Sequence, residues 1–256
     1  MGKRTSYPHG TFSWIDLATT DAAGAKAFYT RLFGWEYVDM PAGEGMIYSM
    51  AQIGGDPVAA LAQQDLDEAP PHWNSYVTVD DVDGLAPRVA ELGGTLVAEP
   101  FDVLDAGRMA VLSDPTGAFL CLWQAKDNIG AQLVNTHGAL TWNDLSTNDA
   151  DAARSFYSEL LGWTFQQVSE EPPYWVIQNG ARSNGGMRVL TEEEAHFPPH
   201  WLPYFAADST DAAASAAIEA GGSVMVDPFD VPSGRVAVLG DPQGAAFAVS
   251  EAEFDE

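Results

Sequence analysis

The sequence predicts an α+β protein built from four modules, each with one strand, one helix and three further strands (βαβββ). Three observations predict this fold class: the two halves of the chain repeat each other, each half repeats its own order of elements, and the four predicted helices have matching lengths. An internal repeat determines how a chain divides into structural units.

The repeat is clearest between residues 10–40 and residues 138–168, which lie 128 positions apart. Of the 31 aligned residues, 13 are identical, and both stretches contain the pattern FYxxLxGW. Shorter matches continue along both halves: PPHW at 70–73 and 198–201, PFDV at 100–103 and 228–231, and GRxAVLxDPxGA at 107–118 and 234–245. Two tandem copies therefore account for nearly the whole chain.

The first module begins with a predicted strand at 12–19, whose apolar residues are bounded by turn-forming residues. Asp21 stands at the N-cap position of a helix, and apolar residues recur at helical spacing up to Gly34, where the helix should end. Glycine-rich and proline-rich breaks divide the following stretch into strands at 35–40, 46–53 and 58–62. The order of elements is therefore βαβββ.

The same order returns after Pro70 and Pro71. It gives a strand at 73–79, a helix at 81–92 that Pro87 interrupts early, and strands at 95–101, 108–112 and 119–123. An aspartate precedes a glycine by thirteen residues around every predicted helix, in the pairs Asp21 and Gly34, Asp80 and Gly93, Asp149 and Gly162, and Asp208 and Gly221. We predict a first domain at 1–127, a linker at 128–135 and a second domain at 136–256, which ends in a short acidic tail.

The chain has 37 acidic and 11 basic residues, which gives a formal net charge of −26. Such a surface repels phosphate backbones and anionic lipids, so we expect neither nucleic acid nor a membrane as a partner. No apolar run approaches the roughly 20 residues of a membrane span, and a single cysteine excludes an internal disulfide. We expect a cytoplasmic monomer whose halves pack as an internal pseudo-dimer, with further oligomers left open.

The four modules, with FYxxLxGW in the first helix of each copy and DPxGA before each last strand, resemble the vicinal oxygen chelate superfamily. That superfamily includes glyoxalase I, bleomycin resistance proteins and extradiol dioxygenases, and the tandem layout is similar to bacterial two-domain glyoxalase or hydroxylase proteins. The resemblance implies two glyoxalase-like domains whose strands form open β-cups. It identifies the fold rather than the reaction, because one scaffold carries many functions. Which modules share a cup stays open, since contiguous and exchanged pairings both occur in this superfamily.

In metal-dependent members, as the resemblance implies, each cup holds a divalent ion with His, Gln or Glu from the first and last strands of its modules. In this chain the first-strand positions are occupied by Trp14, Asn74, Trp142 and Leu202, and two of the last-strand positions are occupied by Cys121 and Ala248. Indole, leucyl and methyl groups do not bind such ions. We therefore expect no metal and no other cofactor.

Strand alternation places residues two positions apart on the same face, so the neighbours of these positions should also face the cups. The predicted ligand-binding residues are Trp14, Asn74, Tyr76, Cys121 and Trp123 in the first half, and Trp142, Leu202, Tyr204, Ala248 and Ser250 in the second. Aromatic walls with a few polar groups are typical of a pocket for a small organic molecule.

Asp16 and Asp144 lie two residues after Trp14 and Trp142, so their side chains should also point into the cups. A carboxylate beside indole rings in an apolar cup would have a raised pKa and could act as a base, so these two are the candidate catalytic residues. In the alternative, each has a structural role and accepts a backbone amide or pairs with Arg108 or Arg235. Two functions follow: a metal-free binding or resistance-type protein for a small aromatic or hydrophobic molecule, or a lyase, dioxygenase or hydroxylase with an aspartate base.

Four histidines form two repeat pairs, His9 with His137 and His72 with His200, and each precedes a strand at the rim of a cup. A structural role and a displaced metal or acid–base site are both compatible with that position. Cys121 could be a nucleophile, but the sequence places no His or Lys to lower its pKa. A small buried hydrophobe is the more typical role of such a residue.

Overall fold

A computed structural model describes residues 2–43, 45–65 and 69–251, so all but the first residue of the expected acidic tail lies outside the described residues. The first half contains β1 (Thr11–Thr19), α1 (Ala22–Phe33), β2 (Glu36–Pro41), β3 (Ile47–Ile53), β4 (Asp56–Gln63), β5 (His72–Thr78), α2 (Val82–Glu91), β6 (Thr95–Val103), β7 (Gly107–Ser113) and β8 (Phe119–Ala125). The second half contains β9 (Leu140–Thr147), α3 (Ala150–Leu161), β10 (Thr164–Glu170), β11 (Pro173–Asn179), β12 (Arg182–Val189), β13 (His200–Ala206), α4 (Thr210–Glu219), β14 (Ser223–Val231), β15 (Gly234–Gly240) and β16 (Ala246–Ser250). The four predicted βαβββ modules are confirmed.

The first helix of each half begins and ends as the sequence predicts. Asp21 caps α1, because its Oδ1 accepts the backbone N–H of Gly24 at 3.0 Å. Gly34 ends the helix in the left-handed conformation, with φ of 71°, which glycine adopts without strain. Asp149 and Gly162 have the same two roles at α3. Among the described residues, no helix is long and apolar enough to cross a membrane.

The second helix of each half begins one residue later than the aspartate-to-glycine spacing predicts. The side chain of Asp81 caps α2 by accepting the N–H of Gly84 at 3.0 Å, and Ser209 caps α4 by accepting the N–H of Ala212 at 3.3 Å. The helix α2 also continues through Pro87, so the predicted interruption is wrong. A buried apolar face on either side of the proline holds the helix in the core.

Each half forms one eight-stranded sheet. The strand order is β2-β3-β4-β1-β5-β8-β7-β6 in the first half and β10-β11-β12-β9-β13-β16-β15-β14 in the second. The two modules of a half meet at an antiparallel pair of central strands, where Trp14 lies opposite Tyr76 and Trp142 lies opposite Tyr204. Contiguous modules therefore share a cup, which answers the question that the sequence left open.

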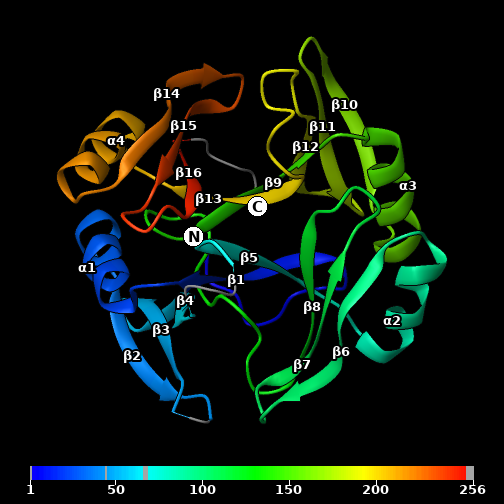
Figure 1. Cartoon of the computed structure of the whole chain (residues 1–256), viewed down its shortest axis with the longest axis horizontal. Coiled ribbons are helices and arrows are strands. Elements are labelled where there is room, and N and C mark those ends of the chain that lie inside the picture. Colours follow the sequence, from blue (N-terminus) through cyan, green and yellow to red (C-terminus); the bar gives the residue numbers. More distant parts are fainter. Residues whose placement is uncertain (1, 44, 66–68, 252–256) are drawn as a thin grey trace.

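The helices pack where the two halves meet (Figure 1). The helix α1 lies beside α4 on one side of the molecule and α2 lies beside α3 on the other, with β1, β5, β9 and β13 between the two pairs. One core cluster joins Phe28 of α1 to Phe205 and Phe247 of the second half, and the other joins Val77 to Phe156 of α3. Because both cores draw on both halves, the division at residues 127 and 136 stays a prediction.

Buried tyrosines connect the halves at each helix pair. The hydroxyl of Tyr157 on α3 donates to Oδ2 of Asp114 at 3.0 Å and accepts the indole N–H of Trp201 at 3.0 Å. Tyr29 on α1 donates to Asp241 of the opposite half at 3.2 Å in the same way. Each carboxylate belongs to a DPxG turn, so these bonds tie the turn of one half to the helix of the other.

We expect Tyr157→Phe to lower the free energy of unfolding by about 1–3 kcal/mol, because it leaves a buried carboxylate oxygen and a buried indole N–H without their partner. Urea-induced unfolding followed by tryptophan fluorescence measures the change. The matched control is Tyr37→Phe, because the buried hydroxyl of Tyr37 has no hydrogen-bond partner among the described residues. The control should keep its full stability, and an equal loss in both variants would contradict the argument.

Candidate functional site

The floor of the first cup is organised around Asp16 of β1, which is buried. Its Oδ2 accepts the hydroxyls of Tyr48 at 2.9 Å and Tyr76 at 2.7 Å, and its Oδ1 accepts the side-chain amide of Asn74 at 2.9 Å. The indole N–H of Trp14 donates to the hydroxyl of Tyr48 at 2.9 Å. Both oxygens of this buried carboxylate therefore have hydrogen-bond donors.

The second cup has a matching cluster around the buried Asp144 of β9. Its Oδ1 accepts the hydroxyl of Tyr174 at 2.8 Å and the indole N–H of Trp142 at 2.9 Å, and its Oδ2 accepts the hydroxyl of Tyr204 at 2.7 Å. Leu202 stands opposite this aspartate, where the first cup has its asparagine. An aspartate bonded to two tyrosines is thus common to both cups.

Strand alternation explains why these side chains meet. In β1, Ile15 and Leu17 point into the helix-bearing core, whereas Trp14 belongs to the separate cluster inside the first cup. Asp16 lies two residues after Trp14 and so points to the same face of the sheet. In the antiparallel pairing of β1 with β5, Asp16 lies directly opposite Asn74. The predicted inward parity therefore follows from the period of two in a strand.

Burial raises the pKa of Asp16 and Asp144, because a carboxylate removed from water is penalised in its charged form. The hydrogen bonds that each carboxylate accepts oppose this shift without cancelling it. Burial, and then the neighbouring carboxylate, also raise the pKa of Tyr76 and Tyr204. Both hydroxyls therefore stay protonated at neutral pH and remain hydrogen-bond donors.

Cys121 and Trp123 of β8 lie in the same apolar cluster as Trp14 and Tyr76. The indole N–H of Trp123 donates to the backbone carbonyl of Asn128 at 2.9 Å, which fixes its ring. Burial, and then the charge of the nearby aspartate, raise the pKa of the Cys121 thiol. A thiol held neutral is a poor nucleophile, so its environment fits a packing role.

In the second cup, Leu202 and Ala248 form a small apolar cluster against which Tyr204 packs. Ser250 is buried at the end of β16, opposite Val236 of β15. The structure thus gathers the predicted residues of each half around one cup. That they bind a ligand stays a prediction.

Sequence reasoning missed Tyr48, Tyr174 and Arg188. The hairpin before β11 is two residues shorter than the one before β3, so the two tyrosines are 126 rather than 128 positions apart and drop out of an ungapped comparison. A comparison that allowed one gap would have paired them.

Arg188 lies near enough to Asp144 for its charge to lower the pKa of that carboxylate. The guanidinium of Arg188 also forms a bidentate pair with Glu194 at 2.7 and 2.9 Å.

The arginines predicted as possible partners of the aspartates lie elsewhere, so that prediction was wrong. Arg108 pairs with Asp83 of α2 at 2.6 Å, and Arg235 pairs with Asp211 of α4 at 2.7 Å. Arg108 alternates along β7 with Met109, which packs against the apolar cluster of the first cup. The guanidinium therefore leaves the other face of the sheet, toward the helix.

The four repeated histidines bond to nearby backbone atoms. Nδ1 of His9 and of His137 accepts the backbone N–H of an aspartate just before α2 or α4, at 3.2 and 3.3 Å. Nδ1 of His72 and of His200 donates to the carbonyl of the proline two residues earlier, at 2.8 and 2.9 Å. These contacts fit a structural role. Within the described residues, no three His, Cys, Asp or Glu side chains are grouped to hold a metal ion.

The strand register completes the test of the expected metal positions. It adds Ala60 of β4, opposite Asp16, and Gly186 of β12, opposite Asp144. The first cup then offers one amide and one neutral thiol, and the second cup offers no donor at these positions. These side chains do not fit a divalent ion.

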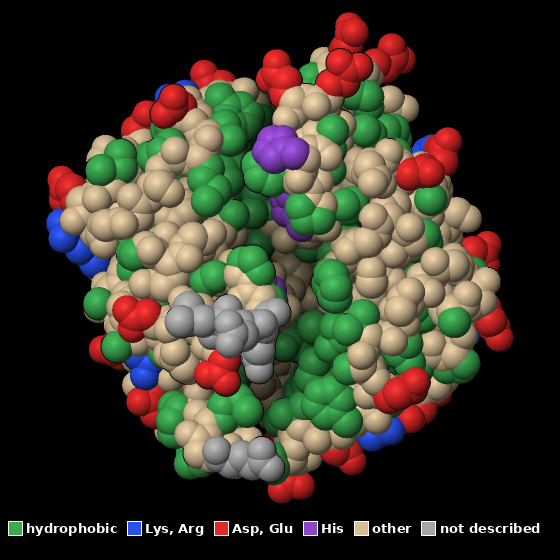
Figure 2. Space-filling model, viewed as in Figure 1, with side chains coloured by type: hydrophobic (Ala, Val, Ile, Leu, Met, Phe, Trp, Pro, Cys, Tyr) green, Lys and Arg blue, Asp and Glu red, His purple; other side chains and the backbone are tan. Residues whose placement is uncertain are grey.

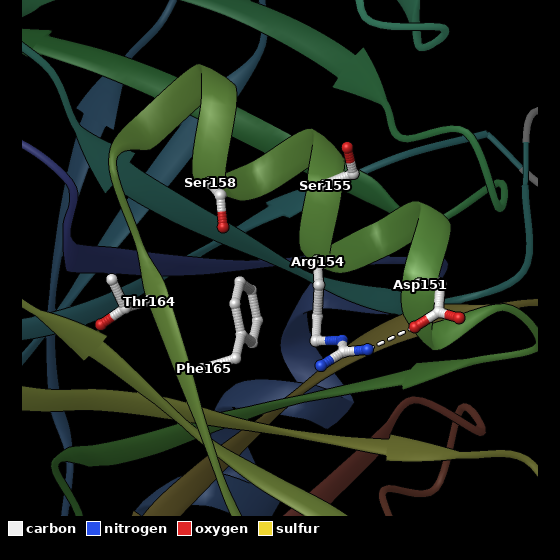
Figure 3. A pocket seen from close by; sticks show the side chains of 6 residues that line it. All are labelled: Asp151, Arg154, Ser155, Ser158, Thr164 and Phe165. Atoms are coloured by element: carbon white, nitrogen blue, oxygen red, sulfur yellow. Dashed lines mark hydrogen bonds and ion pairs between the residues drawn. The ribbon is translucent and has the colours of Figure 1, made fainter.

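An open depression of about 400 Å³ lies outside the cups, between α3 and the start of β10 (Figure 3). The guanidinium of Arg154 is bonded to Asp151 and lies over the ring of Trp175, 5.2 Å from its centre. Its charge is already compensated there. The depression therefore offers a ligand little beyond two serines and the edge of a phenylalanine.

Two family descriptions match the chain. Residues 11–122 match the Glyoxalase/Bleomycin resistance protein/Dioxygenase superfamily, and residues 141–250 match the Glyoxalase-like domain. The "Putative glyoxylase CFP32" of Mycobacterium bovis is 46% identical over 256 residues, which cover 97% of each chain. The "Anthracycline biosynthesis protein DnrV" of Streptomyces peucetius is 36% identical and covers 96% of this chain and 95% of its own.

Solved structures share the fold at low identity. The Mn(II)-bound glyoxalase from Novosphingobium aromaticivorans superposes with a TM-score of 0.67 at 15% identity, covering 100% of this chain and 85% of its own. The 2,3-dioxygenase LapB from Pseudomonas sp. KL28 gives a TM-score of 0.64 at 14% identity, covering 94% and 92%. At these identities the likeness concerns the fold alone.

The raised pKa of the two buried aspartates predicts how stability depends on pH. The contribution of these two carboxyl groups to the free energy of unfolding is fully present below the ordinary aspartate pKa of 3.8. It is lost as the pH rises through the higher pKa of the folded state. The double variant Asp16→Asn, Asp144→Asn should therefore lose less stability than the wild type as the pH rises above about 4. Urea unfolding at a series of pH values measures this.

The exposed Asp83 supplies the control for net charge. Arg108 lowers the pKa of Asp83, so this carboxyl group is already ionised above about pH 4. Asp83→Asn removes a surface charge but should not change how the free energy of unfolding varies with pH in that range. Parallel curves for the wild type and the double variant would refute the account of the buried carboxylates.

The donor sets predict weak metal binding. Protein incubated with Mn²⁺, Fe²⁺, Ni²⁺ or Zn²⁺ and then gel-filtered should retain well below one ion per chain, as measured by inductively coupled plasma mass spectrometry. One ion per chain that is lost in Asn74→Ala or Cys121→Ala would show that the first cup holds a metal after all.

Proposed function

This chain belongs to the glyoxalase/bleomycin resistance protein/dioxygenase superfamily, and from that premise we propose that its cups bind a small aromatic or hydrophobic molecule without a metal. The observation that carries the proposal is the aspartate bonded to two tyrosines on the floor of both cups. The function is of the sequestering or resistance type, in which the molecule is held and not converted.

The walls and the floor of a cup recognise different parts of such a molecule. Trp14 and Trp123 belong to the buried apolar cluster of the first cup, and indole rings of this kind pack well against the aromatic ring of a ligand. On the floor, the tyrosine protons already point at the carboxylate, so the oxygen atoms that remain available are acceptors. A ligand that brings its own hydroxyl donors satisfies them. Hydroxylated aromatic rings therefore suit the cups best.

The relatives support this class of ligand. DnrV of Streptomyces peucetius and DauV of Streptomyces sp. are both named for anthracycline biosynthesis, and each is at least 35% identical to this chain over almost its full length. Anthracyclines contain fused aromatic rings with phenolic hydroxyls, which is the combination that the walls and floor accommodate. We therefore extend the proposal to fused, hydroxylated aromatic molecules.

The alternative is an enzyme that uses Asp16 or Asp144 as a base. The raised pKa of both carboxylates favours it, because a general base works best when its pKa lies near the working pH. The relative named as a glyoxylase also favours it. A glyoxalase-like lyase would use the carboxylate to move a proton from a carbon beside a carbonyl. No residue of the cups is assigned a role in a dioxygenase or hydroxylase reaction.

Alizarin, a dihydroxylated anthraquinone, tests the binding proposal. It should quench tryptophan fluorescence saturably, and anthraquinone without hydroxyls should bind about tenfold more weakly, because it brings no hydroxyl donor to the acceptor oxygens of the floor. The double variant Tyr76→Phe, Tyr204→Phe should erase most of that preference, and Tyr37→Phe is the matched control. Equal binding of both compounds, or of neither, would contradict the proposal.

An assay with the hemithioacetal of methylglyoxal and glutathione tests the alternative. We expect no turnover above the uncatalysed rate by ultraviolet absorbance. Turnover that disappears in Asp16→Asn or Asp144→Asn, while alizarin binding is kept, would assign the aspartates to catalysis and replace the binding function.

A further inference from the structure

A cavity of about 540 Å³ lies where the two halves meet. Its wall consists of the N-terminal segment from Arg4 to Phe12, the end of the linker at 134–135, the start of β9 and the hairpin between β11 and β12. Of the residues predicted to bind a ligand in the cups, only Trp142 also lines this cavity. The volume falls within the range of roughly 300–1,000 Å³ that ligand pockets occupy.

The charge of this cavity differs from that of the rest of the molecule. Acidic residues make up 37 of the 256 residues, and in Figure 2 they surround the edge of the molecule. None of the cavity's 18 lining residues is acidic, whereas Arg4 and Arg182 are basic. At the average frequency about two or three acidic residues would be expected there. A concave wall with charges of one sign concentrates the opposite charge.

The two arginines are available to a ligand. Neither has a carboxylate partner among the described residues, and the guanidinium of Arg4 reaches only the backbone carbonyl of Lys3, at 3.5 Å. By contrast, Arg31 and Arg188 are each paired with a glutamate. A guanidinium without a carboxylate partner, in a wall of neutral polar and aromatic side chains, is well suited to an anionic group, which it can bind through two parallel hydrogen bonds.

The wall is held in place by side chains that bridge the halves. The amide of Asn179 donates to the carbonyl of His9 at 2.7 Å, and the amide of Asn184 donates to the carbonyl of Gly10 at 2.9 Å. The hydroxyl of Tyr7 donates to the carbonyl of Ala131 at 2.6 Å. A cavity whose wall is already ordered binds a ligand at a lower entropic cost.

The repeat suggests one such site in each chain. In the first half, the linker covers the matching place, because the N–H of Ala131 donates to the carbonyl of Ser13 at 2.8 Å. The counterpart of Ser13 in the second half is Thr141, and it lines the cavity. The same strand position is therefore covered by the chain in one half and open to a ligand in the other.

We propose that this cavity binds a small aromatic molecule that carries an anionic group. Arg4 and Arg182 bind the anion, and Leu140 and Trp142 contact the ring. The stoichiometry is one molecule per chain, and the site shares only Trp142 with the floor of the second cup.

The test uses two fluorescent probes that differ in charge, 8-anilinonaphthalene-1-sulfonate and the neutral N-phenyl-1-naphthylamine. Arg182→Gln should weaken binding of the sulfonate about tenfold, because it removes a charge-assisted hydrogen bond, and should leave the neutral probe unchanged. Arg182→Lys should retain part of the affinity. The matched control is Arg31→Gln, which removes the same charge from the distant surface of α1, where Arg31 pairs with Glu219.

Competition identifies the preferred anion. Displacement of the sulfonate probe by 2-naphthoate, but not by 2-naphthyl phosphate, would assign the site to carboxylates, and the reverse would assign it to phosphates. Equal sulfonate affinity in the wild type and in the double variant Arg4→Gln, Arg182→Gln would overturn the proposal. An equal loss in Arg31→Gln would also overturn it, because the effect would then come from net charge.

The same titrations separate this site from the cups. Asp144→Asn and Tyr204→Phe should leave binding of the sulfonate probe unchanged. If these variants abolish its binding and the arginine variants do not, the probe lies in the second cup. That result overturns the cavity proposal and leaves the function proposed for the cups intact.

Discussion

The architecture depends on burying the helices against both halves at once. Phe28 of α1 packs against Phe205 and Phe247 of the opposite half, and the hydroxyls of Tyr29 and Tyr157 reach carboxylates across the same boundary. One face of each sheet is committed to this shared layer. The other face of each sheet is therefore left to form a cup, and the strands that carry the cup floors are held from behind by a rigid core.

That rigidity matters because the cup floors contain buried carboxylates. A carboxylate removed from water is destabilised by several kcal/mol unless hydrogen bonds replace its hydration, and Asp16 receives three of them. The indole N–H of Trp14 donates to the hydroxyl of Tyr48 and so supports the same cluster. The indole of Trp14 thus helps to build the polar centre of the cup.

The sequence predicted the features that depend on local pattern. The caps at Asp21 and Gly34 follow from helix-end chemistry, and the inward parity of Asp16 follows from strand alternation. What it missed depends on contacts between distant segments. The place of Tyr48 on the floor depends on how β3 pairs with β4 and how β4 pairs with β1. Arg108 was misplaced because a repeated arginine does not reveal which face of its strand it leaves. Module pairing likewise depends on strand partners far apart in the chain.

The two halves have diverged in the side chains around the buried aspartates. The amide of Asn74 completes the first floor, whereas Leu202 leaves that place apolar in the second. The second cup has Arg188 near its aspartate instead, and the charge of Arg188 favours the ionised carboxylate. Glu194 compensates that charge, so the floors differ in the polar group beside the aspartate: an asparagine amide in the first cup and an arginine–glutamate pair in the second. Duplication has therefore produced one scaffold with two chemically different cups.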